Sequence, residues 1–155
     1  MDRCPRCRDH RGVRWGGGVD AAQPGVSAST RDIRPRGARV VIVDDSLACR
    51  GVIRELLARR GYDIVGEAGC AAAAIELIDR LSPDAVLLDV HLPDGNGFQL
   101  AAQLGERLPR LAILLTSIDF KSGFYALADV SGARGFVPKS QLAQVQFELF
   151  WSDCA

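Results

Sequence analysis

The chain has 155 residues, which is room for one domain with or without a tail. Nineteen basic and nineteen acidic residues cancel, and hydrophobic residues make up 48% of the chain, a composition that suits a folded core and excludes wholesale disorder. No apolar run reaches the roughly 18 residues of a membrane span, and the N-terminus lacks the apolar stretch of a signal peptide. Five scattered cysteines are not a disulfide framework. We therefore expect a cytoplasmic protein.

The first segment differs in composition from the rest. Nine Arg against four Asp give residues 1–39 a charge of +5, whereas ten Lys or Arg against fifteen acidic residues give residues 40–155 a charge of −5. Because the first segment has no periodic apolar residues, we expect a disordered Arg/Gly-rich tail over 1–37 and a folded domain over 38–155. Cys4, Cys7 and His10 form half of a zinc-site pattern. Whether they bind metal, within or between chains, or belong to a non-native extension stays open.

Short apolar runs alternate with amphipathic stretches in the folded part. Strands are expected over 40–43, from 64, over 85–89, 111–115 and 135–137. Helices are expected from Ser46 to about 60, over 71–81, 98–107 and 120–130, and from 141 to about 150. In the first helix Ile53, Leu56 and Leu57 would face the core and Arg50, Arg54 and Arg59 would not. The alternation predicts an α/β fold, a (βα)5 doubly wound five-stranded parallel sheet with helices on both faces.

Polar residues stand at the carboxyl ends of four of these strands, the edge where open α/β sheets place their active sites. They are Asp44 and Asp45 after the first strand, Asp89 at the end of the third, Thr116 at the fourth and Lys139 after the fifth. Each alone has an ordinary structural explanation. Three nearby carboxylates repel one another unless a cation lies among them, and oxygen ligands suit Mg²⁺. The Lys and Thr could contact a phosphoryl group beside that ion.

Four motifs in this order resemble the response-regulator receiver (CheY-like) domain, a flavodoxin-like fold. They are Val-Ile-Val-Asp-Asp at 41–45, the run from Pro83 to Phe98 around Asp89, Leu-Leu-Thr-Ser at 114–117 and the run from Gly132 to Ser140. The resemblance covers about residues 38–150. Its last motif is most similar to receivers of LuxR/NarL-type regulators, which normally precede a helix-turn-helix domain.

The resemblance implies a role for each strand-end residue. Asp89 would accept the phosphoryl group as a 4-aspartylphosphate. Asp45 and Asp89 would ligate Mg²⁺ directly, Asp44 through water, and His91 through its backbone carbonyl. Lys139 would help to neutralise charge during transfer.

Thr116 and Phe136 would form the switch. Thr116 would move to the phosphoryl oxygen and Phe136 would follow inward, which makes the face of the fourth helix, fifth strand and fifth helix the expected output surface. The His91 ring could order a water and tune the lifetime of the phosphoaspartate, or His91 could contribute its carbonyl alone. Pro138 precedes Lys139 and Ser140 follows it, which argues against the cis peptide that many receivers have after the Lys.

The expected function is that of a stand-alone receiver in a two-component phosphorelay, phosphorylated by a sensor histidine kinase or phosphotransfer protein and signalling through protein contacts. The alternative is a phosphorylation-independent binding or adaptor module with a receiver fold. No substrate turnover beyond its own phosphotransfer and autodephosphorylation is expected, so the chain is not predicted to be an enzyme in the usual sense. Neither membrane binding nor sequence-specific DNA binding is expected, whereas a phosphorylation-dependent dimer is compatible with the output surface.

Overall fold

The computed structural model describes residues 37–152, and the expectations for the tail before Gly37 and for Cys4, Cys7 and His10 lie outside this range. Five parallel strands form one sheet in the order β2-β1-β3-β6-β7. The strands are β1 (Arg39–Val43), β2 (Asp63–Ala68), β3 (Ala85–Asp89), β6 (Ala112–Ser117) and β7 (Gly135–Pro138). The predicted five-stranded parallel sheet is confirmed.

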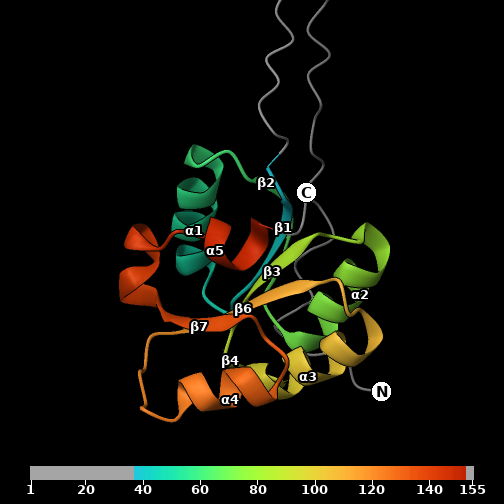
Figure 1. Ribbon diagram of the computed structural model, residues 1–155. Coiled ribbons are helices and arrows are strands. Elements are labelled where there is room, and N and C mark those ends of the chain that lie inside the picture. The colour runs from blue at the N-terminus through green and yellow to red at the C-terminus, as the bar shows by residue number, and fades with distance from the viewer. Residues whose placement is uncertain (1–36, 153–155) are drawn as a thin grey trace, which may run out of the picture.

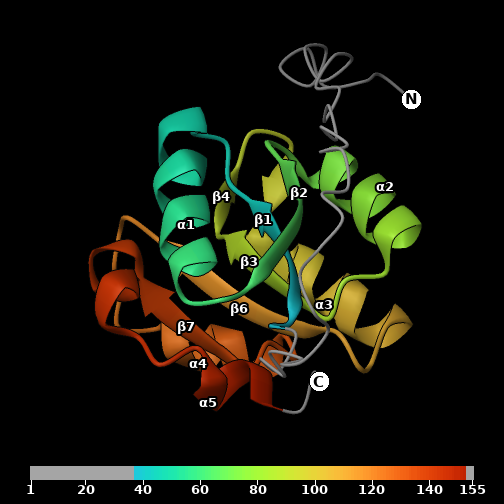
Figure 2. The same ribbon diagram turned by 90° about the horizontal axis from the view of Figure 1, so that it is seen from above.

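Helices cover both faces of the sheet (Figures 1 and 2). One face packs against α1 (Leu47–Arg59), the 3-10 helix η2 (Lys139–Gln144) and α5 (Glu148–Trp151). The other packs against α2 (Ala71–Leu81), α3 (Gly97–Arg107) and α4 (Phe124–Val130). The fold is therefore doubly wound, as the alternation of strands and helices predicts.

The three central strands, β1, β3 and β6, are mostly apolar because both faces of the sheet are covered there. In β1, Val41 and Val43 lie in the core beside α2 and α3, whereas Val40 and Ile42 lie in the core beside α1. All five residues of β3 and all six of β6 are buried. Continuous apolar runs are typical of such parallel strands, and here they place the polar residues at the strand ends.

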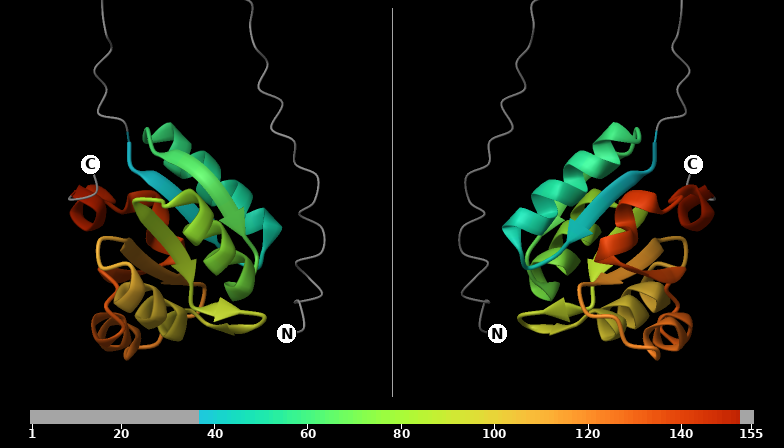
Figure 3. Two further views of the ribbon diagram at one scale, coloured as in Figure 1. Left: turned by 90° about the vertical axis from the view of Figure 1, so that its right-hand side faces the viewer. Right: turned by 90° about the vertical axis from the view of Figure 1, so that its left-hand side faces the viewer.

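A short antiparallel ribbon follows β3 where the sequence predicts a turn. It pairs β4 (His91–Leu92) with β5 (Gly95–Asn96). Figure 3 shows the ribbon at the end of the molecule away from the start of β1. Both carboxylate oxygens of Asp94, at its tip, accept hydrogen bonds from the amides of Ala71 and Ala72, at 2.7 and 3.0 Å. The ribbon thus caps the N-terminus of α2, whose own N-cap residue provides no side-chain hydrogen bond.

The single final helix predicted from 141 to about 150 is wrong. The chain forms η2, becomes extended at Val145, and resumes as the single turn of α5. The guanidinium of Arg60 donates to the carbonyls of Ala143 and Val145, which a continuous helix would use for its own hydrogen bonds. The helix predicted over 120–130 is also shorter, because residues before Gly123 form an exposed loop and turn.

None of the helices found between residues 37 and 152 is long and apolar enough to cross a membrane.

Candidate functional site

The sheet brings the predicted strand-end residues to one edge. Asp44 follows β1 directly, Asp89 is the last residue of β3, and Lys139 follows β7. Asp89 is paired in register with Thr116, so these two lie on adjacent strands. Asp44, Asp89 and Thr116 are buried, whereas Asp45 is exposed at the mouth of the site. The topology thus assembles residues that are up to 95 positions apart, from Asp44 to Lys139.

Three carboxylates at this edge fit a divalent cation. One oxygen from each of Asp44, Asp45 and Asp89 lies within 4.8 Å of the others. Asp44 Oδ2 is buried and faces the Lys139 ammonium at 2.5 Å. Three carboxylates against one ammonium give these four side chains a formal charge of −2. Oxygen donors with this charge suit Mg²⁺, and the carbonyl of the exposed His91 is close in sequence to Asp89.

Lys139 connects two of these carboxylates. Its ammonium lies 2.5 Å from Asp44 Oδ2 and 2.7 Å from Asp89 Oδ2. Burial on its own lowers the pKa of Lys139, but the hydrogen bonds and charges of Asp44 and Asp89 outweigh burial and raise that pKa above its ordinary value. Lys139 is therefore held in its charged form against the predicted acceptor, where it can neutralise developing negative charge.

Burial and the hydrogen-bond partners of Asp89 act on its pKa in opposite directions. Burial raises its pKa above the ordinary value, although hydrogen bonds from Lys139 and from the His91 amide oppose the rise. The His91 amide donates to Asp89 Oδ1 at 3.1 Å. Gly97 packs on the backbone behind it, since an added Cβ there would be 2.3 Å from the Asp89 carbonyl oxygen. The start of α3 and the ribbon thus fix Asp89 from the backbone side.

The Thr116 hydroxyl donates its hydrogen bond to β7 and not to the carboxylates. It donates to the carbonyl of Val137 at 2.7 Å, across to β7. Ser117, the next residue, is fully buried, and its hydroxyl has no hydrogen-bond partner among the described residues. A turn of Thr116 toward Asp89 would therefore break a bond between the ends of β6 and β7.

Phe136, the predicted switch aromatic, is buried at 3% exposure. Its ring contacts those of Phe120, Phe124 and Tyr125, with centroids 6.2, 5.2 and 5.6 Å away. The His91 ring lies 6.4 Å from that of Phe124. Phe136 is therefore already buried in this structure, so the expected inward movement would not start from an exposed position. Phe120 and Tyr125, whose rings contact it, are half exposed. Its role in switching stays a prediction.

No cis peptide bond occurs between residues 37 and 152, which includes the peptide after Lys139.

Two residues near the site were placed wrongly or missed by the sequence interpretation. Arg50 was expected on the polar side of α1 but is 4% exposed. Its spacing from Ile53 and Leu57, three and seven residues on, is that of a single helix face and could have indicated burial. The run Pro-Asp-Gly-Asn-Gly at 93–97 is typical of a turn leading into the third helix, so Asp94 was expected only as a turn residue. No local signal predicts that it caps a helix more than twenty residues earlier.

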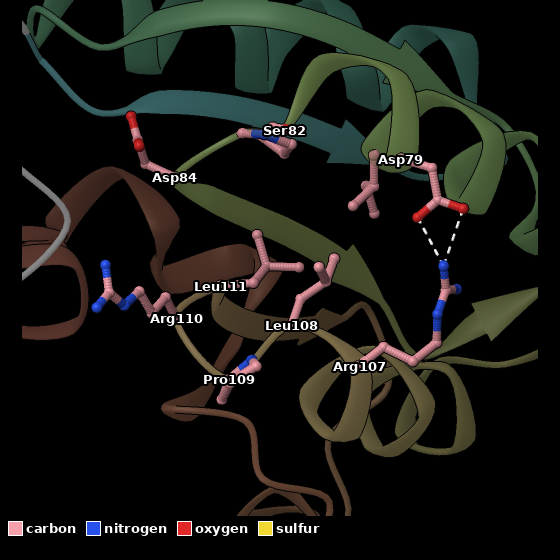
Figure 4. Close-up of a pocket in the computed structure, with 10 residues that line it drawn as sticks. Asp79, Ser82, Asp84, Arg107, Leu108, Pro109, Arg110 and Leu111 are labelled. Carbon is pink, nitrogen blue, oxygen red and sulfur yellow. Dashed lines mark hydrogen bonds and ion pairs between the residues drawn. The ribbon is translucent and has the colours of Figure 1, made fainter.

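A hollow of about 570 Å³ lies at the opposite edge of the sheet, before the starts of β3 and β6. Figure 4 shows Asp79 and Arg107 joined across its rim by an ion pair, with the Arg110 side chain directed away from them. Ser82, Pro83 and Leu108 line it. None of the predicted site residues contributes to this hollow.

Comparison of the sequence with known families identifies the class of protein. The model of the response regulator receiver domain matches residues 40–146, so the chain belongs to this family, the receivers of two-component systems. Phosphorylation and Mg²⁺ binding are typical of its members.

Among similar proteins, the DNA-binding transcriptional activator DevR/DosR of Mycobacterium tuberculosis is 38% identical over 102 residues, 65% of this chain and 47% of DevR/DosR. The chemotaxis protein CheY of Thermotoga maritima is 30% identical over 103 residues, 66% of this chain and 86% of CheY. The chain thus spans about half the length of DevR/DosR and most of CheY. The solved receiver domain of NarL from Mycobacterium tuberculosis has a TM-score of 0.65 and 32% identity, and the match covers 71% of this chain and 93% of that domain.

Proposed function

We propose that this receiver accepts a phosphoryl group on Asp89 from a sensor histidine kinase or a phosphotransfer protein. The observation that carries the proposal is the contact of the Lys139 ammonium with both Asp44 and Asp89, beside a third carboxylate, at the carboxyl edge of the sheet. Membership of the receiver family supports it. Cytoplasmic location and action without an appended output domain stay predictions from the sequence.

In the transfer, a carboxylate oxygen of Asp89 bonds to phosphorus as the bond from phosphorus to the donor's imidazole nitrogen breaks, and the imidazole leaves with the electron pair. Lys139 lies against the accepting carboxylate, where it would contact an oxygen of the transferred phosphoryl group. The backbone amide of His91 holds the other Asp89 oxygen, which leaves one oxygen to act as the nucleophile. We expect no turnover beyond this transfer and the loss of the group to water.

Asp44, Asp45 and Asp89 would hold Mg²⁺, with the His91 carbonyl as a further ligand. When bound, Mg²⁺ supplies positive charge beside the phosphoryl oxygens. The residues of the chain orient these carboxylates: Asp44 Oδ1 accepts from the Ser46 amide at 2.9 Å, and this turn leads into α1.

Signal output would begin at Thr116. If its hydroxyl turns to a phosphoryl oxygen, it releases the Val137 carbonyl, next to Phe136. The aromatic cluster around Phe136 includes residues of α4 and of the loop before it. A local charge change would thus reach the surface formed by α4, β7 and the last segment.

The exposed side of α4 suits a protein partner. Tyr125, Leu127 and Val130 are 48, 44 and 81% exposed, and Ile118 in the preceding loop is 73% exposed. Apolar side chains gathered on one exposed element are typical of protein-contact sites. The same surface would serve a downstream target or a second phosphorylated copy. We favour phosphate-dependent contact over the adaptor alternative, because a phosphate-independent module has no need of the Asp and Lys cluster.

The test is labelling with a small phosphodonor, with and without Mg²⁺. Wild-type protein should incorporate one phosphoryl group when Mg²⁺ is present, and Asp89→Asn should incorporate none. Asp79→Asn, which changes an exposed aspartate far from the site, is the matched control and should label like the wild type. Labelling of Asp89→Asn at the wild-type rate would contradict the proposal. Hydrogen exchange of the labelled protein should change most in residues 116–137.

A further inference from the structure

Arg50 is a buried cation next to the acidic turn that no role described above uses. Its side chain is 5% exposed, and it projects from the first turns of α1. One guanidinium nitrogen donates to the carbonyl oxygen of Asp44 at 2.5 Å. Burial of a guanidinium is unfavourable unless it is paired and hydrogen-bonded. The contact with the Asp44 carbonyl is one of the interactions that offset this cost.

The contact completes the restraint of Asp44. Its amide donates to the Ala68 carbonyl at 3.0 Å, its Oδ1 accepts from the Ser46 amide, and its Oδ2 faces Lys139. The carbonyl held by Arg50 belongs to the peptide that joins Asp44 to Asp45. Because a peptide unit is planar, fixing this carbonyl fixes the direction in which the chain enters Asp45.

Asp45 has no comparable restraint of its own. It is exposed, and no hydrogen bond to its carboxylate is found among the described residues. The orientation of its carboxylate therefore depends on the peptide before it and on the start of α1. Of the three carboxylates, the orientation of Asp45 should therefore depend most on Arg50.

Two features of β2 and the loop after it hold Arg50 in place. Glu67 Oε2 lies 3.3 Å from Arg50 Nε. Gly69 leaves room for the guanidinium, since an added Cβ at residue 69 would lie 3.2 Å from it. Glu67 also pairs with Arg54 at 2.7 Å, but Arg54 is half exposed and makes no contact with Asp44.

We propose that Arg50, held by Glu67, is a positioning residue that directs the Asp45 carboxylate and so sets the affinity of the site for Mg²⁺. The inference rests on the proposed function, since it assumes that Asp45 is a ligand. Residues that orient metal ligands without touching the metal typically change metal affinity by about 10–100-fold when they are replaced.

The experiment is a calorimetric titration of the full chain with Mg²⁺, comparing Arg50→Gln with Arg54→Gln. Both variants remove one arginine from Glu67, but only the first removes the contact with the Asp44 carbonyl. We expect the Mg²⁺ Kd of Arg50→Gln to rise about tenfold or more and that of Arg54→Gln to stay within about twofold of the wild type. A general loss of structure would lower the number of binding sites rather than the affinity of each.

A second variant keeps the charge. Gly69→Ala displaces the guanidinium by a few tenths of an ångström without removing it, and it should also raise the Kd. In labelling experiments, both Arg50→Gln and Gly69→Ala should need more Mg²⁺ for half-maximal rate yet reach the wild-type rate at saturation.

Equal Kd values for Arg50→Gln, Arg54→Gln and the wild type would overturn the inference alone. If Arg50→Gln does not fold, an unchanged Kd in Gly69→Ala would overturn it. Failure of the wild type to bind Mg²⁺ would overturn the metal site of the proposed function and this inference with it.

Discussion

At the scale of single residues, burial and polar contacts have opposite effects on the charge of one carboxylate, that of Asp89. Asp89 is buried, which disfavours its charged form, while Lys139 and the His91 amide favour it. The net effect is a raised pKa, so burial outweighs these partners in the protein without bound metal. A cation bound beside Asp89 would therefore favour its charged form.

Replacement of Asp89 by Asn should therefore stabilise the unphosphorylated domain without added metal. Asn has nearly the same shape and carries no charge, and Lys139 keeps its ion pair with Asp44. We expect the free energy of unfolding to rise by about 1 kcal/mol at neutral pH, the scale of a single buried substitution. Urea unfolding of the two proteins in the presence of a chelator measures the difference. A loss of stability would show that the ion pair between Lys139 and Asp89 outweighs burial.

Tyr62 provides a pH-dependent test far from the site. Burial, with help from Glu148, raises the pKa of Tyr62 to about 12. The unfolded chain releases this proton near pH 10 while the folded protein keeps it, so between about pH 10 and 12 the unfolded state binds fewer protons and stability falls as pH rises. The fall attributable to Tyr62 has an upper limit of about 1.4 kcal/mol per pH unit, reduced by partial exposure.

The comparison that isolates this effect is wild type against Tyr62→Phe, which lacks the titrating group. Thermal unfolding from pH 8 to 12 should show the wild type losing stability relative to the variant only above pH 10. A constant difference over that range would mean that the phenol is not buried by α5.

At the scale of elements, side-chain contacts rather than a continuous helix hold the last segment, residues 139–151, against the sheet. Arg60 bonds the carbonyls of Ala143 and Val145, and its guanidinium lies 5.2 Å from the Phe147 ring centroid. Phe147 is fully buried and stacks on Trp151 at 4.8 Å. The apolar residues predicted for a final helix thus still cover the sheet, although the helix itself is interrupted.

Arg60→Ala should loosen this segment. Loss of two charge-assisted hydrogen bonds and of a cation–π contact should lower the free energy of unfolding by about 2 kcal/mol and speed amide exchange in residues 145–151. Arg59→Ala is the matched control, since Arg59 is exposed and pairs only with Glu55 among the described residues. It should cost less than about 0.5 kcal/mol. Equal effects of the two variants would contradict the role given to Arg60.

Element types followed from local periodicity, but element ends depended on distant partners. The strands were predictable from short apolar runs, and the second helix from its apolar periodicity. The first and third helices were predictable from Ser46 and from the turn at 93–97, which precede them. The break at Val145 was not, because its cause lies in Arg60, eighty-five residues earlier. The capping of α2 by Asp94 was likewise not predictable, because the two are far apart in the sequence.

At the scale of the whole molecule, a parallel sheet explains why the acidic, hydroxyl and ammonium groups could be placed from sequence. All five strands run in one direction, so residues that end separate strands meet at one edge. The direction of the Thr116 hydroxyl, the burial of Phe136 and the contacts of Arg50 were not predictable, because they depend on side-chain packing between strands.

The central claim is that Asp89 is the phosphoryl acceptor, and reductive trapping tests it most directly. Borohydride converts an aspartyl phosphate to homoserine, which peptide mass spectrometry can locate in protein treated with a phosphodonor and Mg²⁺. We expect homoserine at position 89, none at positions 44 and 45, and none anywhere in Asp89→Asn. Homoserine at Asp44 or Asp45, or a phosphorylated protein with Asp89 unmodified, would contradict it.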